Sequence, residues 1–200
     1  MTERIFPHWE SFYRERAAET MPWYFDGLDP DFAIELDALG ITRGRVLDIG
    51  TGAGTQAIVL AQRGFDVTAT DIAEAAIDHA RRSTSEHGVQ VELLVDDVLD
   101  SQVEGAFDVV FDRGCFHTLA PDRRGEYVAM VAKHVRAGGH LLLKCFSHLQ
   151  PGDVGPHRFT QDEIAGAFAG GFVLRSARET VYQGTLDPLP LAMCCVFERV

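Results

Sequence analysis

Short apolar segments alternate along this chain with longer segments in which apolar residues recur at helical spacing. The short segments are predicted as strands and the longer ones as helices, because the two spacings match the periods of these structures. The predicted strands are 46–49, 65–71, 89–95, 106–111, 140–146, 172–183 and 191–199, and the predicted helices are 8–18, 30–39, 55–63, 74–82, 122–135 and one that begins after Thr160. Strands separated by helices form parallel sheets, so the pattern predicts an α/β fold with a mostly parallel sheet and helices on both faces.

The chain is expected to form one domain preceded by a helical arm. Its 200 residues are enough for a sizeable core, and no repeat, low-complexity tract or linker divides them. We predict a helical N-terminal arm or lid at 1–40 and a single domain at 41–200. Trp23 and Tyr24 lie in a segment of the arm without helical spacing, which favours a loop whose aromatic side chains pack over another part of the molecule.

The segment 46–54 joins a buried strand to a turn with three alternate glycines and then to a helix. Such a turn lets a ligand approach the backbone closely, and dinucleotide-binding folds use one to bind phosphate. Here Thr55 replaces the third glycine of the dinucleotide pattern. Asp48, just before the turn, would repel a pyrophosphate but suits a ligand that carries an ammonium group. A turn that binds no ligand is the alternative interpretation.

The same segment resembles the first motif of the class I S-adenosylmethionine-dependent methyltransferases. The resemblance implies that the glycines line the methionine and ribose portions of the cofactor, S-adenosyl-L-methionine, and that Asp48 helps to hold its amino-acid end. It also implies a Rossmann-like sheet of seven strands, with the last strand antiparallel to the rest.

Two acidic residues later in the chain, Asp71 and Asp97, lie at positions suited to bind S-adenosylmethionine. Asp71 ends the second predicted strand, close to the interval of roughly 20 residues expected for an acid that binds ribose hydroxyls. Asp71 could also cap the helix 74–82, since Asp is a good N-cap. Asp97 follows the third strand, where in the resembling family an acid faces the adenine amino group; a solvated acidic loop is the alternative.

The residues 112–117 follow the fourth predicted strand, where an open α/β sheet is expected to bring the methyl group. Asp-Arg-Gly followed by Cys resembles the thiopurine and thiol methyltransferase branch, which methylates small soft nucleophiles, and the segment 120–127 resembles that branch too. The ordinary pKa of His117 suits a base, although a loop histidine without a chemical role is the favoured interpretation. Arg113 is predicted either to orient an acidic substrate or to pair with a loop carboxylate.

The predicted site has three groups of residues. Those predicted to bind the cofactor are Asp48, Gly50, Thr51, Gly52, Gly54, Asp71, Ile72, Asp97, Val98, Asp112 and Gly114. Those predicted to bind the acceptor are Trp23, Tyr24, Cys115, Phe116, His157 and Arg158, and those predicted to act in catalysis are His117 and Arg113. No metal site is predicted, because the cysteines lack C-x-x-C spacing and the histidines are scattered.

The charge of the chain narrows the range of partners. The formal net charge is −12, and the 18 basic residues do not cluster, which argues against a nucleic-acid substrate. No apolar run approaches the roughly 20 residues of a membrane span, and the first residues show no secretory apolar core. We therefore expect a cytoplasmic protein; the sequence leaves its oligomeric state open.

The predicted function is direct transfer of a methyl group from S-adenosylmethionine to a small-molecule acceptor, with a thiol or another soft nucleophile as first choice. Three alternatives stay open: an O- or N-methyltransferase of a small metabolite, a nicotinamide-dependent oxidoreductase, and a non-catalytic protein that binds the cofactor.

Overall fold

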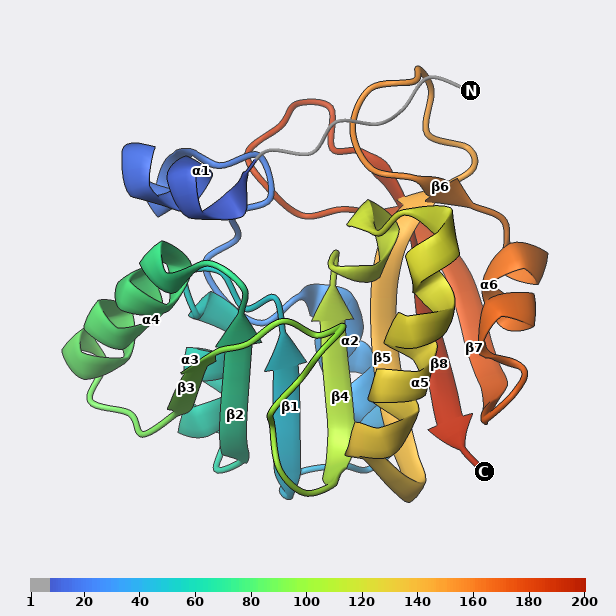
Figure 1. Ribbon diagram of the computed structural model, residues 1–200, viewed down its shortest axis with the longest axis horizontal. Helices are drawn as coiled ribbons and strands as arrows, with labels where there is room; N and C mark the ends of the chain where they lie inside the picture. The colour runs from blue at the N-terminus through green and yellow to red at the C-terminus, as the bar shows by residue number, and fades with distance from the viewer. Residues whose placement is uncertain (1–7) are drawn as a thin grey trace.

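A computed structural model describes residues 8–200 of the chain, and within this range the strands form one sheet (Figure 1). The first seven residues of the predicted arm lie outside the described residues. The strands are β1 Arg45–Ile49, β2 Asp66–Asp71, β3 Glu92–Val95, β4 Phe107–Arg113, β5 Val135–Ser147, β6 Arg158–Phe159, β7 Phe172–Val181 and β8 Leu191–Arg199. The helices are α1 Trp9–Glu15, α2 Pro30–Ala38, α3 Thr55–Gln62, α4 Glu74–Glu86, α5 Arg124–His134 and α6 Gln161–Phe168, with short 3-10 helices at Ala18–Thr20, Phe116–Thr118 and Pro121–Arg123.

The sheet has the order β3-β2-β1-β4-β5-β8-β7, and the short strand β6 pairs with the end of β5. Strands β1 to β6 pair in parallel, whereas β8 runs antiparallel to both of its neighbours, β5 and β7. The predicted mostly parallel sheet with an antiparallel last strand is confirmed. The two residues of β6 make an eighth strand that the sequence did not predict.

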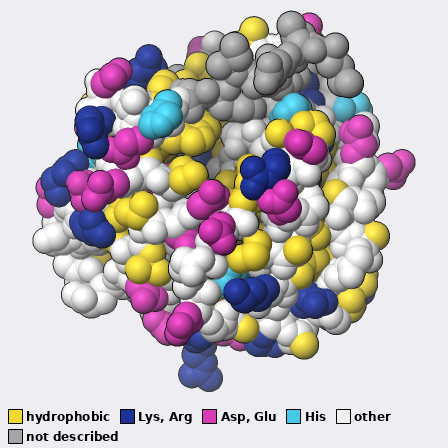
Figure 2. Space-filling model, in the orientation of Figure 1, with side chains coloured by type: hydrophobic (Ala, Val, Ile, Leu, Met, Phe, Trp, Pro, Cys, Tyr) yellow, Lys and Arg dark blue, Asp and Glu magenta, His cyan; other side chains and the backbone are white. Residues whose placement is uncertain are grey.

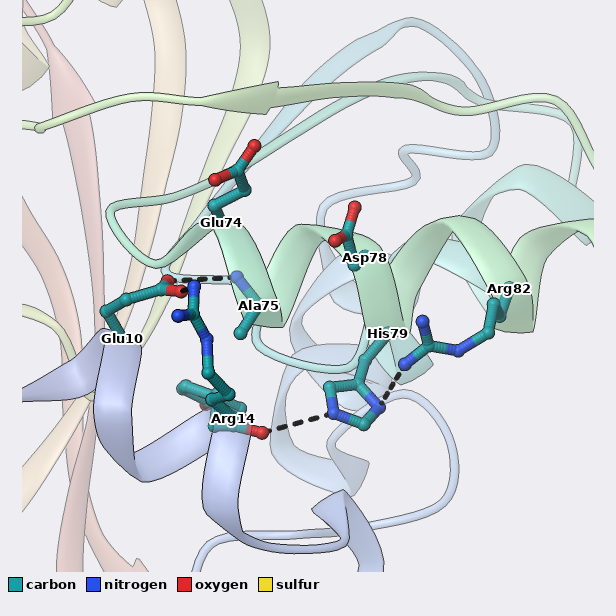
Figure 3. Close-up of a pocket in the computed structure, with 8 residues that line it drawn as sticks. Glu10, Arg14, Glu74, Ala75, Asp78, His79 and Arg82 are labelled. Carbon is teal, nitrogen blue, oxygen red and sulfur yellow. Dashed lines mark hydrogen bonds and ion pairs between the residues drawn. The ribbon is translucent and has the colours of Figure 1, made fainter.

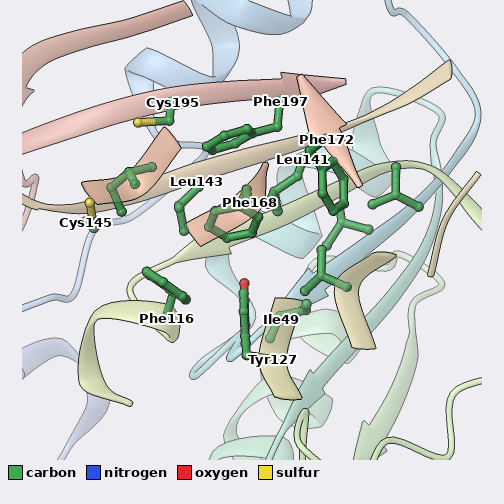
Figure 4. Packing of buried hydrophobic residues seen from close by; sticks show 14 of the residues in the cluster. Ile49, Phe116, Tyr127, Leu141, Leu143, Cys145, Phe168, Phe172, Cys195 and Phe197 are labelled. Atoms are coloured by element: carbon green, nitrogen blue, oxygen red, sulfur yellow. The ribbon is translucent and has the colours of Figure 1, made fainter. Parts of the chain in front are cut away.

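Two apolar clusters hold helices against the two faces of the sheet. On one face, Tyr127 of α5 and Phe168 of α6 pack with Phe116 and Phe197 (Figure 4). On the other face, Phe32 of α2 packs with α3 and the strands. The predicted arm therefore includes a helix, α2, that covers the sheet.

Several element boundaries differ from the prediction. Helix α1 ends at Glu15, earlier than predicted. Helix α5 begins at Arg124 and not at 122, because a 3-10 turn, Pro121–Arg123, precedes it. Strand β5 begins at Val135, before the predicted start at 140, and includes Gly138 and Gly139. Helix α6 begins after Thr160, as predicted, and Thr160 and Glu163 form a capping box at its start.

The arm, residues 9–27, lies across the carboxyl ends of the strands, with α1 above β2 and next to α4 (Figure 1). These strand ends and the arm enclose the region where the sequence places its candidate site. No helix of residues 8–200 is long and apolar enough to cross a membrane.

Candidate functional site

The turn between β1 and α3 has a backbone that only glycine adopts without strain. Gly50, Gly52 and Gly54 have φ angles of +67°, +57° and +77°, in the left-handed region that a Cβ disfavours. Space is also short: a Cβ on Gly54 would lie 2.9 Å from the Cβ of Ala80, and one on Gly52 would lie 2.7 Å from the hydroxyl of Tyr13. The glycines thus bring the backbone close to whatever lies above the turn.

Asp48 is buried below this turn and fastens it to the end of β1. Its carboxylate accepts hydrogen bonds from Thr51 Oγ1 at 2.6 Å and Gln56 Nε2 at 2.8 Å. Burial raises the pKa of Asp48 to about 6. Gln56, which the sequence reasoning missed, also has a buried Oε1 without a hydrogen-bond partner among the described residues.

Asp71 ends β2 and faces the turn. Its Oδ2 accepts from the backbone N–H of Gly52 at 3.0 Å, and its Oδ1 accepts from that of Ala73 at 2.9 Å. The predicted N-cap role is wrong, because helix α4 has Ala73 as its N-cap. Each oxygen of Asp71 can accept a further hydrogen bond. Burial raises the pKa of Asp71 to about 6.

The end of β3 completes this side of the site. Asp97 is exposed, and its Oδ1 accepts from the N–H of Leu99 at 2.9 Å. The N–H of Asp96 donates to the carbonyl of Asp71 at 3.0 Å, which keeps the ends of β2 and β3 together. Ile72 leaves 53% of its surface exposed, and Val98 is half-buried against the core. We call the turn 48–54 together with 71–73 and 95–98 the cofactor side.

The other side of the site begins at Asp112, which is completely buried at the end of β4. Its carboxylate accepts from the N–H groups of Gly114, Cys115 and Phe116 at 2.6 to 2.9 Å and from the hydroxyl of Tyr127. Four donors therefore occupy the two oxygens, and burial raises the pKa of the group. Asp112 shapes the loop after β4.

Arg113, the next residue, binds three parts of the protein. Its guanidinium donates to Asp29 at 2.8 Å and to the carbonyls of Trp23 and Gln183. Asp29 also accepts from the buried Lys144 of β5 at 2.8 Å. The geometry does not test the predicted orientation of a substrate by Arg113; it shows this side chain joining the arm to the segment after β7.

His117 is buried and its ring has protein contacts on three sides. Its Nδ1 accepts from the N–H of Phe146 at 3.1 Å, which places the ring proton on Nε2. The ring stacks on Tyr182 with centroids 5.7 Å apart and meets Phe146 edge-on. Burial lowers the pKa of His117 to about 3. His117 is thus neutral at physiological pH. The lone pair on Nδ1, which a base would use to take a proton, already accepts the hydrogen bond from Phe146.

The remaining residues predicted to bind the acceptor divide into two groups. Trp23, Tyr24 and Cys115 are half-buried. Phe116 is completely buried in the core, where it packs on Tyr127 and Phe159, so it lines no accessible surface.

Arg158 begins β6, and its guanidinium donates to the carbonyls of Gln150 and Val154 in the loop that precedes this strand. The N–H of His157 donates to the carbonyl of His117 at 2.9 Å, which places this loop beside the loop after β4. We call 112–118 together with Phe146 and Tyr182 the acceptor side.

Sequence reasoning did not assign Tyr13, Phe146 or Tyr182 to the site. The hydroxyl of Tyr182 donates to the carbonyl of Arg113. Tyr182 lies far along the chain from the loop that contains Arg113, so no local sequence pattern predicts this contact. The missing side chain of Gly114 leaves room for this hydroxyl. Tyr13 bonds Trp23 Nε1 at 3.1 Å and lies over Gly52.

The cofactor side fits S-adenosylmethionine. The turn offers a cradle that a Cβ would fill, Asp71 keeps acceptor capacity for two hydroxyls, and the exposed Asp97 and Ile72 can meet a polar and an apolar edge of a ring. Residues 8–200 hold no group of three or more side chains suited to bind a metal ion.

Comparison with known proteins gives a match to a family model described as a methyltransferase domain, over residues 46–139. This match covers the glycine turn and all the predicted cofactor residues, from Asp48 to Gly114.

Two curated relatives differ in their substrates. Ribosomal RNA small subunit methyltransferase C of Serratia proteamaculans is 28% identical over 191 residues, which are 91% of this chain and 52% of that protein. The chain therefore spans about half the length of this relative. The 2-heptyl-1-hydroxyquinolin-4(1H)-one methyltransferase of Mycobacteroides abscessus is 29% identical over 82% of this chain and 75% of its own length.

Among solved structures, one from work on the conversion of a disulfide bond into a thioacetal group during echinomycin biosynthesis has a TM-score of 0.83. It is 26% identical and covers 96% of this chain and 91% of its own. The 1,6-didemethyltoxoflavin-N1-methyltransferase of Burkholderia thailandensis, solved with S-adenosylhomocysteine, has a TM-score of 0.72 at 24% identity over 86% of this chain and 77% of its own.

Residues 46–139 are thus similar to a methyltransferase domain, and the fold of the chain is that of solved methyltransferases, one of them with S-adenosylhomocysteine bound.

Proposed function

We propose that this protein transfers a methyl group from S-adenosylmethionine to a small-molecule acceptor, and that the acceptor atom is a thiol sulfur or another soft nucleophile. The observation that carries the proposal is the difference between the two sides of the site. The cofactor side keeps free acceptor capacity, whereas the polar side chains of the acceptor side are bound to the protein itself.

On the cofactor side, Asp71 would accept hydrogen bonds from the two ribose hydroxyls. Asp97 would face the adenine amino group, Ile72 would lie against the ring, and the turn with Asp48 would hold the methionine portion. The bound cofactor supplies an activated methyl group, so the protein has to position the acceptor and exclude water.

On the acceptor side, neither His117 nor Asp112 is available to act as a base for an alcohol. His117 has a pKa lowered to about 3 and an occupied Nδ1, and Asp112 accepts from four donors. An acceptor that ionises by itself near neutral pH needs no such base, and a thiol meets this condition. The similarity to a structure concerned with sulfur chemistry supports the same choice.

A hydroxyl or nitrogen acceptor is the second candidate, because the quinolone and toxoflavin methyltransferases are similar to this chain. Ribosomal RNA is disfavoured by the net charge of −12. On the face that Figure 2 shows, Lys and Arg side chains are scattered among acidic ones and form no continuous basic patch.

The test is a screen with isotopically labelled S-adenosylmethionine against matched acceptors that differ in one atom, such as thiophenol, phenol and aniline, together with ribosomal RNA. We expect methyl transfer to the thiol to be the fastest. Activity on phenols or amines with thiols inert would remove the sulfur proposal, and label incorporated only into RNA would remove the small-molecule proposal. In the same series, tighter binding of NAD than of S-adenosylhomocysteine would contradict the proposal that S-adenosylmethionine is the cofactor.

A further inference from the structure

A cluster of buried charges lies between α2 and the sheet, next to the acceptor side. Lys144 of β5 and Asp29, the N-cap of α2, are completely buried, and Asp31 is 6% exposed. We call these three residues the charge cluster. Nζ of Lys144 lies 2.8 Å from both carboxylate oxygens of Asp29 and 2.6 Å from Oδ2 of Asp31. Burying ions costs free energy, and apolar side chains of similar size are often as stable. Stability alone therefore does not account for the cluster.

Asp29 connects the charge cluster to Arg113 on the acceptor side. Its Oδ2 accepts from Nε of Arg113 at 2.8 Å, and its Oδ1 accepts from the N–H of Asp31 at 3.0 Å. Two cations and one backbone N–H thus fix the carboxylate of Asp29 in position and orientation. The guanidinium of Arg113 is planar and bonds in a fixed fork, so the carboxylate in turn sets the orientation of this guanidinium.

The rest of the Arg113 guanidinium holds two segments that come from distant parts of the chain. Nη1 donates to the carbonyl of Trp23 at 2.9 Å, and Nη2 donates to that of Gln183. Its Cζ lies 4.8 Å from the centroid of the Tyr182 ring, and the backbone carbonyl of Arg113 accepts from the Tyr182 hydroxyl. One side chain therefore sets the places of Trp23 and Tyr182 beside the loop after β4.

The same two segments also fit closely against each other. The N–H of Thr185 donates to the carbonyl of Pro22 at 3.1 Å, and its Oγ1 donates to that of Met21 at 3.1 Å. A Cβ on Gly184 would lie only 2.1 Å from the carbonyl oxygen of Pro22. Because the segments are in such close contact, a displacement of one at Arg113 is passed on to the other.

The cofactor side is attached to the arm through other contacts (Figure 3). Oε2 of Glu10 on α1 accepts from the N–H of Ala75 on α4 at 3.0 Å, and the ring of His79 donates to the carbonyl of Tyr13 at 3.2 Å. Tyr13 also packs against α4 in a buried apolar cluster. Trp23 reaches this side through its bond to the Tyr13 hydroxyl. Changes in the charge cluster should therefore have only a small effect on the cofactor side.

From these contacts we infer that Asp29 and Lys144 are positioning residues for the acceptor. Lys144 orients the carboxylate of Asp29, and this carboxylate orients Arg113. Arg113 then holds Trp23 and Tyr182 where an acceptor would contact them. The inference rests on the proposed function, because it takes the acceptor side as the place where the acceptor binds.

Asp29→Asn tests this chain of contacts, because Asn keeps the volume and the N-cap of α2 but removes the charge. Steady-state kinetics uses the fastest acceptor among thiophenol, phenol and aniline, and calorimetry gives Kd for S-adenosylhomocysteine. We expect kcat/KM for the acceptor to fall by roughly tenfold to a hundredfold, since a small misplacement is enough for such a loss. Kd should change by less than about threefold. Arg113→Lys should act in the same direction, because an ammonium group has no fork to reach both carbonyls.

Arg178→Met is the matched control. Arg178 bonds Asp31 at 2.7 Å and Glu35 at 3.2 Å, so its loss removes two ion pairs at the charge cluster and none to Asp29. We expect this variant to unfold at a lower temperature while kcat/KM stays that of the wild type. A loss of kcat/KM as large as in Asp29→Asn would overturn the inference, because stability alone would then explain both. Unchanged kcat/KM in a folded Asp29→Asn or Arg113→Lys protein would also overturn it.

A second readout needs no methyl transfer. In a Trp9→Phe background Trp23 is the only tryptophan, and acrylamide quenching of its fluorescence reports its exposure. We expect stronger quenching in Asp29→Asn and Arg113→Lys than in the wild type, and no change in Arg178→Met. Unchanged quenching in the first two variants would contradict the positioning of Trp23 whatever the activity. If the wild type methylates none of the acceptors, the proposed function fails by itself, whereas an active wild type with equally active variants removes only the positioning role.

Discussion

The two sides of the site use buried carboxylates in opposite ways. Asp71, on the cofactor side, accepts one backbone N–H at each oxygen and keeps capacity for a ligand. Asp112, on the acceptor side, accepts from three N–H groups and a tyrosine hydroxyl and has no capacity left. An acid at a strand end can thus serve either a ligand or the loop that surrounds the ligand, and only its partners show which.

The basic side chains near the acceptor side also bond to the protein and keep little capacity for a ligand. Arg113, Arg158 and His117 were candidates for contacting or activating an acceptor, yet each bonds backbone or buried side chains of the protein. On the acceptor side, the rings of His117, Phe146 and Tyr182 pack on one another, and the polar side chains around them bond to the protein. Such packed rings can exclude water and orient an acceptor without supplying a base.

The largest expected effect is on stability, from the acceptor side. Asp112→Ala leaves three N–H groups without their acceptor in a buried loop, and we expect the free energy of unfolding to fall by about 3–5 kcal/mol. Urea denaturation measures this loss. Asp122→Ala, at an exposed position in the following turn, is the control and should change stability little. A loss below about 1 kcal/mol for Asp112→Ala would mean that the loop does not depend on this carboxylate.

The next effect is on ligand affinity, from the cofactor side. Asp71→Ala removes two charge-assisted hydrogen bonds to the ribose, and we expect S-adenosylhomocysteine to bind about 2–3 kcal/mol more weakly in calorimetry. The ligand-free protein should lose less stability, about 1 kcal/mol. Asp66→Ala, at the exposed start of the same strand, should bind normally. A large loss of stability with unchanged affinity would give Asp71 the same supporting role as Asp112.

A smaller effect concerns pH. Burial raises the pKa of Asp71 from 3.8 to about 6. Because the pKa in the folded state is above that in the unfolded state, the stability contributed by this group is fully present below about pH 4 and is lost as pH rises through about 6.

Binding should depend on pH in the opposite direction, because the ionised carboxylate is the stronger acceptor for the ribose. We expect Kd for S-adenosylhomocysteine to increase as pH falls below about 6, by at most about tenfold per unit. Asp48 has a pKa raised to about the same value, so calorimetry of Asp71→Asn and Asp48→Asn separates the two groups. An unchanged profile in Asp71→Asn would contradict the role of Asp71.

Sequence reasoning predicted the fold correctly and grouped residues that the structure brings together on the cofactor side, because the signals for both are local. The glycine turn, the acids at the ends of β1 and β2 and the alternation of strands and helices each lie within a short segment of chain. The acceptor side is assembled by contacts between distant segments, such as Arg113 with Trp23 and Gln183, and His117 with Tyr182. No period or spacing in a single sequence predicts such contacts between residues that lie far apart in the chain.

Phe116 shows the same limit within one motif. It stands between Cys115 and His117, yet it turns into the core on Phe159 and Phe168, which come from later elements. Its neighbours along the chain gave no sign of this orientation, because the core that it joins is formed by segments that follow it.

The smallest predicted effect tests the central claim, that methyl transfer to a soft acceptor here needs no protein base. The measurement is the dependence on pH of the single-turnover rate with a series of thiols of different acidity, for the wild type and for His117→Ala. We predict that the rate follows the pKa of each thiol in both proteins, and that the substitution lowers it by less than about fivefold. A profile that follows one protein group for every acceptor, together with a loss of about a hundredfold or more in His117→Ala, would contradict the claim.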